Sequence, residues 1–230
     1  MAQDLNIVTE HVLSSELDLQ DVLSSGAVEG YALRNVCIRC LSFQDKLLQN
    51  VSVNRVAMPG ISFEDAQART VQWTESAMRG ALFTRASIDK LNMLNCEAIE
   101  CHFNEAVIEN SGFFETTMSN VSFKRAKLIQ TQFQSTELYG ASFENAFLAK
   151  CTFSDPKMGN ASLTRTDFRN ALIIDSSLKG ANLHASNFQN AILIRVDLRG
   201  ANLVRADLRG AALIDCQLNP GDLEGALFDK

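Results

Sequence analysis

Residues 181–215 read ANLHA SNFQN AILIR VDLRG ANLVR ADLRG AALID, which is seven consecutive groups of five with a large apolar residue at each centre. The same register extends in both directions, from Leu23 to Phe228, and only Ala68 and Ala98 are small at the central position. Two residues before each centre stands a second series, which is mostly alanine or another small residue. The sequence is therefore an array of pentads in one unbroken register.

A period of five fits neither an α-helix nor a flat strand, because successive repeats would point to different sides of both. The backbone must therefore turn a corner once per pentad. A longer period of twenty accompanies it, since phenylalanine recurs at positions 43, 63, 83, 103, 123 and 143 and glycine at positions 60, 80, 140, 180 and 200. Four pentads per coil stack like residues on like residues and place glycine at one corner, where a tight turn uses its backbone freedom. The repeats predict about ten coils, which form a rod about 50 Å long at the usual strand spacing.

The pattern A-[DN]-L-x-x, seen in Ala201–Leu203 and Ala206–Leu208, resembles the pentapeptide-repeat family. This resemblance covers nearly the whole chain. It implies an all-β fold, a right-handed quadrilateral parallel β-helix of about ten coils with four pentads each. Members of the family have diverse functions, so the resemblance is specific for fold and says little about activity.

The N-terminal part of the chain fits the pattern least. We expect residues 1–20 to form a cap or an irregular first coil, because a stacked array needs its open end covered, and residues 21–230 to form the β-helix. The N-terminal half has Met58, Trp73 and Met93 as centres. These residues predict a less regular cross-section there.

Three of the five positions in each pentad point outward, and on one face most of them are aliphatic. This face is centred on Ile173, Leu193 and Leu213. The outward residues are Leu172, Ile174, Ile192, Ile194 and Ile214. A contiguous apolar patch on a rod needs a cover, so we expect a contact surface for a second copy of the chain or for another protein. The family resemblance permits a homodimer, since several members dimerise end to end. With a constant coil of twenty residues, Leu94 and Phe114 would lie further along the same face.

A run of acidic residues without lysine or arginine occupies the middle of the chain, between Leu91 and Phe123. Its members are Glu97, Glu100, Glu105, Glu109 and Glu115. The coil period distributes them around the rod. They form either a solvated belt that aids solubility or a docking site for a basic partner.

Acidic and basic residues alternate at short range toward the C-terminus. Asp197 and Asp207 lie two residues before Arg199 and Arg209, and Asp167 precedes Arg169 in the same way. These pairs predict neutralising ladders along the walls. They count against a long, uniformly negative surface.

The composition suits one repeat array without metals or disulfides, because the chain has 230 residues and 46% of them are hydrophobic. The formal net charge is −6, which disfavours direct nucleic-acid binding because phosphate contact needs a basic surface. No apolar run approaches the roughly 20 residues of a membrane helix, and residues 1–10 lack the features of a signal peptide. We expect a cytoplasmic protein without a membrane or nucleic-acid partner.

The histidines and cysteines do not indicate catalysis or metal binding. His102 and His184 would lie on one face about 20 Å apart, too far to share a metal or a nucleophile. Cys37 and Cys40 form a C-x-x-C pair without a second pair to complete a zinc site. The other cysteines occupy the small inward position, where cysteine packs as a compact hydrophobe. The sequence therefore predicts no enzyme, and no catalytic residue, metal, cofactor or small-molecule substrate.

A filled rod has surfaces for recognition and no reaction chamber, so we expect a non-catalytic protein-binding rod. The first hypothesis is an inhibitor or immunity-type protein that binds and neutralises a bacterial toxin or another DNA-acting enzyme. The second, which the resemblance to quinolone-resistance members implies, is a DNA-mimicking protector or modulator of DNA gyrase or topoisomerase. The unbroken register argues against its loop-bearing members, whose coils are interrupted. The third is a structural or targeting scaffold associated with a secretion system.

Overall fold

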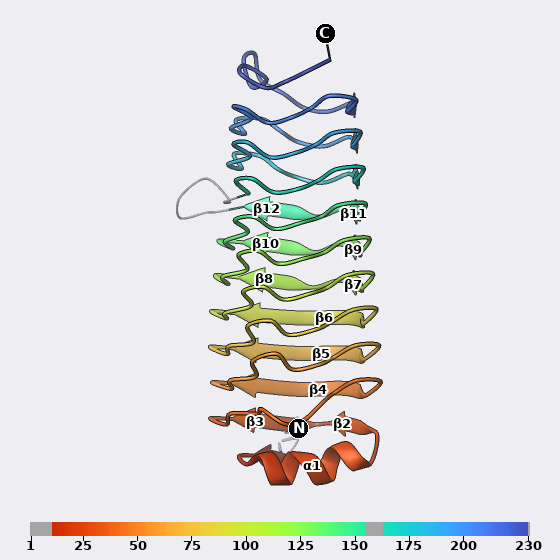
Figure 1. The fold of residues 1–230 in the computed structure, drawn as a ribbon, viewed down its shortest axis with the longest axis vertical. Coiled ribbons are helices and arrows are strands. Elements are labelled where there is room, and N and C mark those ends of the chain that lie inside the picture. The colour runs from red at the N-terminus through yellow and green to blue at the C-terminus, as the bar shows by residue number, and fades with distance from the viewer. Residues whose placement is uncertain (1–10, 155–162, 230) are drawn as a thin grey trace, which may run out of the picture.

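The computed structural model describes residues 11–154 and 163–229. The chain winds into a rod of about ten turns, in which strands stack above one another across the long axis (Figure 1). Its strands form one parallel sheet that bends around the rod. The elements are β1 (His11–Leu13), α1 (Glu16–Ser24), β2 (Ala27–Glu29), β3 (Tyr31–Arg34), β4 (Leu47–Asn54), β5 (Gln67–Thr74), β6 (Ser87–Leu94), β7 (Val107–Glu109), β8 (Gly112–Phe114), β9 (Lys127–Ile129), β10 (Gln132–Gln134), β11 (Phe147–Ala149), β12 (Thr152–Ser154), β13 (Leu172–Ile174), β14 (Ile192–Ile194) and β15 (Ala212–Ile214). The expected quadrilateral β-helix is confirmed.

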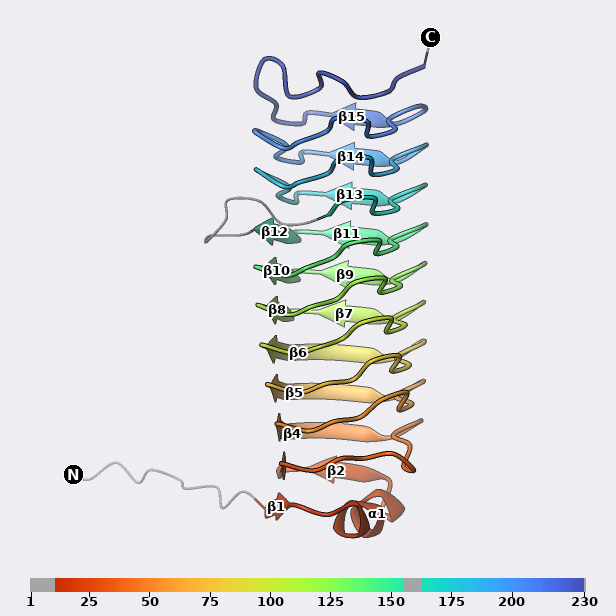
Figure 2. The ribbon, with the colours of Figure 1, turned by 60° about the vertical axis from the view of Figure 1, so that its left-hand side comes forward.

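All the strands of the described residues lie on two of the four faces. One face contains β2, β7, β9, β11, β13, β14 and β15, and the adjacent face contains β1, β3, β8, β10 and β12. The longer strands β4, β5 and β6 continue around the corner between them (Figure 2). Isolated parallel bridges, such as Leu82 with His102 and Ala57 with Ala77, join the coils on the remaining two faces.

The coil length changes once in the described part of the chain. Up to β12 each residue pairs with the residue twenty positions later, as Gln132 does with Thr152. Phe147 instead pairs with Leu172, which is 25 positions later, and the period of twenty then resumes. The coil between β11 and β13 is therefore five residues longer than the others that the structure describes. The expectation of uninterrupted twenty-residue coils is wrong at this point, although the pentad register itself never slips.

Stacked aromatic rings fill the interior. The predicted phenylalanine ladder is present, with ring centroids 4.4–5.0 Å apart between successive coils from Phe43 to Phe143. It continues across the 25-residue coil to Phe168 at 5.1 Å and then to Phe188 at 4.7 Å. A second ladder, Phe113, Phe133 and Phe153, meets the first edge to face. Both arrangements are favourable geometries for aromatic quadrupoles.

The cross-section is less regular near Trp73, as the sequence predicts. The Trp73 ring packs at a tilt against Phe63 and Phe83, beside Ala68, the small centre on the neighbouring face. The large indole ring fills the space that the small side chain of Ala68 leaves in the core. The Trp73 indole Nε1 is buried and has no hydrogen-bond partner among the described residues, so this donor is desolvated without compensation.

The corners follow one backbone rule. The fifth residue of nearly every pentad has a positive φ, and where it is not glycine φ lies between 49° and 60°. Gly60, Gly80 and Gly140 share one corner, whereas the longer coil places Gly180 and Gly200 at the corner that precedes it along the chain. The expectation of a single glycine corner is therefore wrong. Nearly all the described corners turn in this same way, mostly without glycine.

A helix covers the N-terminal end of the rod (Figure 2). The side chain of Ser15 accepts the Asp18 backbone N–H and starts α1, which buries Leu19 and Leu23. Oε1 of Glu16 accepts the backbone N–H groups of Arg39 and Cys40, each at 2.8 Å, and these two donors lower the pKa of Glu16. The helix ends at Ser24, beyond the expected boundary at residue 20, and β1 already pairs with β3 before it. At the other end, Leu213, Leu218 and Leu223 are only partly buried.

Candidate protein-binding surfaces

The face that carries β13, β14 and β15 exposes aliphatic side chains in two columns. Leu172 lies beside Ile192 and then Ala212 in the first column, and Ile174 beside Ile194 and then Ile214 in the second. Ile192 is 42% exposed and Ile214 is 46% exposed, whereas the others are partly buried by their neighbours. The structure thus brings all five predicted stripe residues together on one surface.

The stripe is longer than the sequence indicates, and it continues along different residues. Because of the 25-residue coil, Phe147 and Ala149 of β11 lie next to Leu172 and Ile174, and Ile129 of β9 follows. We call Ile129, Phe147, Ala149, Leu172, Ile174, Ile192, Ile194, Ala212 and Ile214 the aliphatic stripe. The expectation that Leu94 and Phe114 share this face is wrong, because these residues lie on the adjacent face.

A signal for the missed residues exists in the sequence. Phenylalanine centres recur at Phe168 and Phe188, 25 and 45 residues after Phe143, instead of at positions 163 and 183. The same shift moves His184 away from the face of His102, so these two histidines do not share a face as expected. The spacing of the phenylalanine centres therefore indicates which residues of successive coils share a face.

Charges of alternating sign follow one edge of the stripe. Lys150, Asp175, Arg195 and Asp215 occupy successive coils at the corner directly after β11, β13, β14 and β15. The Arg195 guanidinium lies 2.6 Å from the Asp175 carboxylate and lowers the pKa of that carboxyl by hydrogen bonding. Both side chains are largely exposed, so the pair contributes little to stability.

The acidic residues of the middle coils surround the rod, as predicted. Glu109 lies on β7, Glu97 lies on a face without strands, and the other three occupy corners. Neighbouring coils neutralise two of them, since Arg79 pairs with Glu100 at 2.9 Å and Arg125 with Glu105 at 2.8 Å. Glu97 and Glu109 make no ion pair with any described residue. We call the five glutamates the acidic belt, whose docking role stays a prediction.

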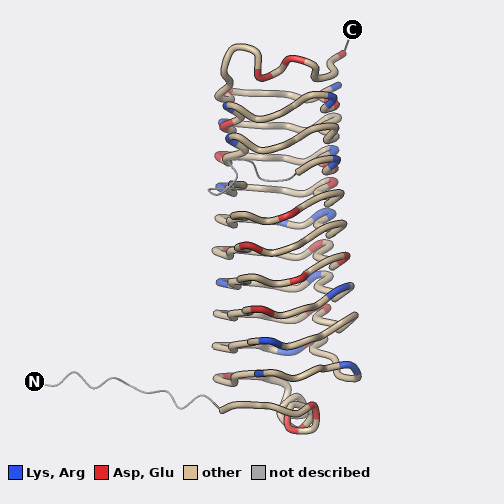
Figure 3. Tube along the Cα trace, turned by 90° about the vertical axis from the view of Figure 1, so that its left-hand side faces the viewer, with Lys and Arg blue, Asp and Glu red and all other residues tan. Residues whose placement is uncertain are grey.

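The C-terminal walls carry the predicted neutralising pairs (Figure 3). Asp197 and Arg199 lie 2.7 Å apart, and Asp207 and Arg209 lie 2.5 Å apart. Arg169 contacts Asp167 at 2.8 Å and Glu144 at 3.4 Å. Acidic and basic groups therefore alternate along the surface at short range.

The tightest pair predicts a measurable pH effect. The Arg209 side chain, the Arg209 backbone N–H and Gln189 all donate to Asp207 and lower the pKa of its carboxyl to about 2 from the ordinary 3.8. The stabilising contribution of the ionised carboxylate is therefore complete above about pH 4 and is lost as the pH falls through about 2. Carboxyl NMR titration is expected to show this value in the native protein, and Arg209→Gln to raise it toward 3.8. Arg199→Gln is the matched control, and an unchanged Asp207 pKa in Arg209→Gln contradicts the assignment.

The cysteines pack as expected at the small inward position. Cys96, Cys101 and Cys151 are buried, and burial raises the pKa of Cys101 to about 12 and that of Cys151 to about 11. Cys37 and Cys40 are exposed and unbridged. Within residues 11–154 and 163–229 no group of three His, Cys, Asp or Glu side chains is placed to hold a metal ion. No helix in these ranges is long and apolar enough to cross a membrane.

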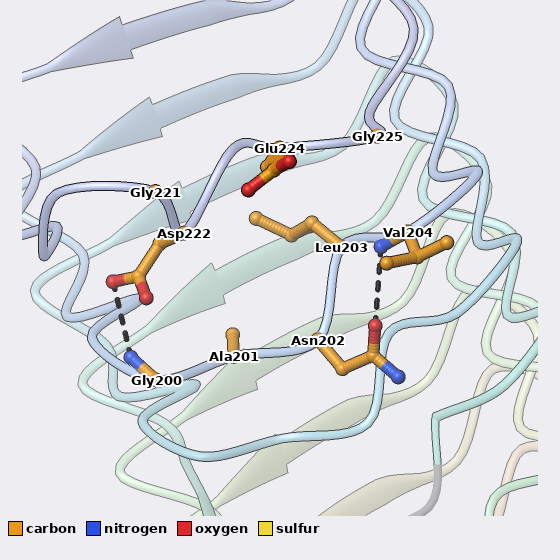
Figure 4. A pocket seen from close by; sticks show the side chains of 9 residues that line it. All are labelled: Gly200, Ala201, Asn202, Leu203, Val204, Gly221, Asp222, Glu224 and Gly225. Carbon is orange, nitrogen blue, oxygen red and sulfur yellow. Dashed lines mark hydrogen bonds between the residues drawn. The ribbon is translucent and has the colours of Figure 1, made fainter.

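A shallow hollow lies at the C-terminal end, where the segment Gly221–Gly225 rises away from the preceding coil (Figure 4). Its floor is Gly200 to Val204. The Gly200 backbone N–H donates to Asp222 at 3.1 Å, and this bond holds the segment down on one side. The side chains of Asp222 and Glu224 are the ionisable groups that line it. The hollow is open to solvent and lies outside the filled core.

Several solved structures are similar to this chain. HetL, a pentapeptide repeat protein involved in heterocyst differentiation regulation from the cyanobacterium Nostoc sp. strain PCC 7120, is 18% identical over 94% of this chain and 97% of its own, with a TM-score of 0.42. QnrB1, a plasmid-mediated fluoroquinolone resistance protein, is 14% identical over 96% of this chain and 94% of its own, with a TM-score of 0.41. The catalytic domain of a GH87 alpha-1,3-glucanase is 9% identical over 89% of this chain and 53% of its own, with a TM-score of 0.42.

No curated protein sequence matches the chain. The family model for pentapeptide repeats matches in 8 copies, over residues 118–155, 158–190 and 191–229. The coils that precede this region have the same pentad register and the same corner geometry. By these repeats the region of residues 118–229 belongs to the pentapeptide-repeat family.

Proposed function

We propose that this protein is a non-catalytic, protein-binding rod of the inhibitor or immunity type, which binds and neutralises a bacterial toxin or another DNA-acting enzyme. The observation that carries the proposal is a rod whose interior is filled with stacked side chains and whose surface bears two features suited to protein contact, the aliphatic stripe and the acidic belt. A stripe of this kind needs a macromolecular cover. The coils hold it in place, so little entropy is lost when a partner binds.

The acidic belt supplies the surface for the enzyme itself. Glu97 and Glu109 make no ion pair with a described residue and lie on two different faces of the rod. An enzyme that acts on DNA has a basic substrate groove, because phosphate binding requires one. Carboxylates on a rigid rod occupy such a groove in place of phosphates and exclude the substrate.

The second candidate is a protector or modulator of DNA gyrase or topoisomerase. The 25-residue coil between Phe147 and Leu172 removes the argument that uninterrupted coils provide against it. The alternation of acidic and basic residues toward the C-terminus still weakens extended DNA mimicry. The two candidates therefore fit the fold equally well and differ in the enzyme that is bound.

Capture from a bacterial host tests the proposal. We expect the tagged protein to retain a DNA-acting enzyme, identified by mass spectrometry, and the purified protein to inhibit DNA cleavage by that enzyme. Glu97→Lys with Glu109→Lys reverses the belt charge and is expected to weaken inhibition at least about tenfold, because like charges then face the basic groove. Glu64→Lys with Glu224→Lys makes the same change in charge outside the belt and is the matched control.

Two outcomes contradict this assignment. Normal DNA cleavage by the captured enzyme in the presence of excess protein removes the inhibitory role. A change in gyrase supercoiling or quinolone susceptibility, without any captured toxin, replaces it with the second candidate.

A further inference from the structure

We propose that a second copy of this chain covers the aliphatic stripe, with the two rods packed face to face and their long axes antiparallel. The inference rests on the proposed function in one respect, since it treats the stripe as a protein-contact surface. It goes further because it names the occupant and the register of the contact. The acidic belt then lies outside the contact on both copies.

The symmetry of the contact follows from the layout of the face. A two-fold axis parallel to the strands, midway between β13 and β14, places β13 opposite the partner's β14 and β11 opposite the partner's β15. Each column of side chains then faces itself in reverse order. Such an isologous contact uses the same surface patch on both copies.

Side-chain sizes match in this register. Phe147, the largest residue of the first column, faces the partner's Ala212, and Leu172 faces the partner's Ile192. In the second column the small Ala149 faces the partner's Ile214. Large residues thus meet small ones at the ends of the contact, and branched aliphatic residues meet at its centre, so the two faces fill each other's gaps.

Charges match in the same register. Lys150 lies at the edge of β11 and faces the partner's Asp215 beyond β15. Asp175 likewise faces the partner's Arg195. A shift of one copy by a single coil instead places Lys150 opposite the partner's Arg195, and Asp175 opposite its own equivalent. Like charges across a contact disfavour that register, so the edge specifies the alignment.

Parallel rods are the competing arrangement, and the N-terminal half of the face disfavours them. Arg69, Asp89 and Glu109 project from β5, β6 and β7 on this same face. Two parallel rods in register would desolvate these charges against neutral residues of the partner, which is costly. In the antiparallel arrangement the polar halves point away from each other and stay in water.

The contact has the size of a specific interface. An accessible surface of 11390 Å² over about ten turns with four faces each corresponds to about 280 Å² per face and coil, so the four coils from β11 to β15 offer on the order of 1,000 Å² per copy. A standard interface buries about 800 Å² per partner. The area of the overlap is therefore large enough for a reversible dimer.

Molecular mass in solution is the first test. We expect sedimentation equilibrium to give twice the 25.3 kDa of one chain, and Ile192→Asp with Ile194→Asp to give the monomer with an unchanged circular-dichroism spectrum. Val107→Asp, on the same face but outside the overlap, is the matched control and remains dimeric. A monomeric native protein at every concentration overturns the proposal. A dimer that persists in the Ile192→Asp, Ile194→Asp variant also overturns the proposal.

Charge exchange between two chains tests the register. Lys150→Glu and Asp215→Lys are each expected to raise the dissociation constant at least about tenfold, because each homodimer then has a like-charged pair at both ends of the contact. Mixing the two variants restores native affinity in a heterodimer, in which both pairs are again opposite in sign. Lys90→Glu, at the same corner in the N-terminal half, leaves the affinity unchanged. Failure of the mixed variants to associate better than either alone overturns the antiparallel register.

Separate measurements test the proposed dimer and the proposed inhibition, so the failure of one is distinguishable from the failure of the other. The belt variant, Glu97→Lys with Glu109→Lys, is expected to keep the dimer mass while it loses enzyme inhibition. The stripe variant, Ile192→Asp with Ile194→Asp, is expected to lose the dimer while each monomer still inhibits. A protein that dimerises as described without inhibiting any enzyme leaves the stripe assignment intact and removes the proposed function.

Discussion

Replacing Phe123 with alanine is expected to lower the free energy of unfolding by about 3–5 kcal/mol. Phe123 is fully buried, and its ring lies 5.0 Å from that of Phe103 and 4.8 Å from that of Phe143. It also meets the edges of Phe113 and Phe133. Backbone hydrogen bonds fix the spacing between this coil and the coils above and below it. These coils therefore cannot move closer to close the cavity. The cost therefore lies at the high end for a large-to-small change.

Phe228→Ala is the matched control for this prediction. Phe228 occupies the same central position on the same face, but it is 47% exposed in the last coil. Its removal leaves little cavity and is expected to cost less than about 1.5 kcal/mol. Urea denaturation followed by circular dichroism measures both variants. Equal destabilisation by the two substitutions would show that ring stacking in the interior is not what stabilises the coils.

Replacing Leu19 with aspartate is expected to detach α1 from the rod at a cost of at least about 3 kcal/mol. Leu19 is 1% exposed and packs against the first coil together with Leu23. Aspartate there leaves a void and buries a carboxylate without a partner. The contacts of Glu16 with the backbone N–H groups of Arg39 and Cys40 are then lost with the helix.

Leu17→Asp is the internal control, because Leu17 belongs to the same helix and is 75% exposed. It is expected to change stability by less than about 0.5 kcal/mol. Amide hydrogen exchange distinguishes the two variants, since Leu19→Asp exposes the amides of Arg39 and Cys40 and Leu17→Asp does not. Continued protection of these two amides in Leu19→Asp would contradict the assignment of α1 as the cap.

The fold was predictable because one physical rule repeats along the whole chain. Nearly all the bulky centres, and most of the small residues two positions before them, are buried wherever a coil lies on both sides, as with Phe123 and Val121. The five stripe residues were predictable for the same reason, since β13, β14 and β15 follow one another at the period of twenty.

Which residues share a face was harder to predict than which residues point inward. A whole extra pentad preserves the order of inward and outward residues, so pentad counting does not detect it between Phe147 and Leu172. It changes only which residues share a face, and Phe147 and Ile129 were missed in this way. The α1 helix was missed as a helix because its apolar residues Leu19 and Leu23 also satisfy other patterns at this length.

The positive φ angles at the corners bear on how the rod forms. A residue with a side chain pays roughly 1–2 kcal/mol in this conformation, and nearly every corner adopts it, including Thr70 and Arg85. One coil in isolation has no neighbour whose hydrogen bonds and rings offset that cost. The first two adjacent coils are therefore the difficult step, and each later coil adds to an existing template. Assembly of the rod is thus an initiation followed by growth, in which a newly made turn becomes stable only after it is laid against a finished one.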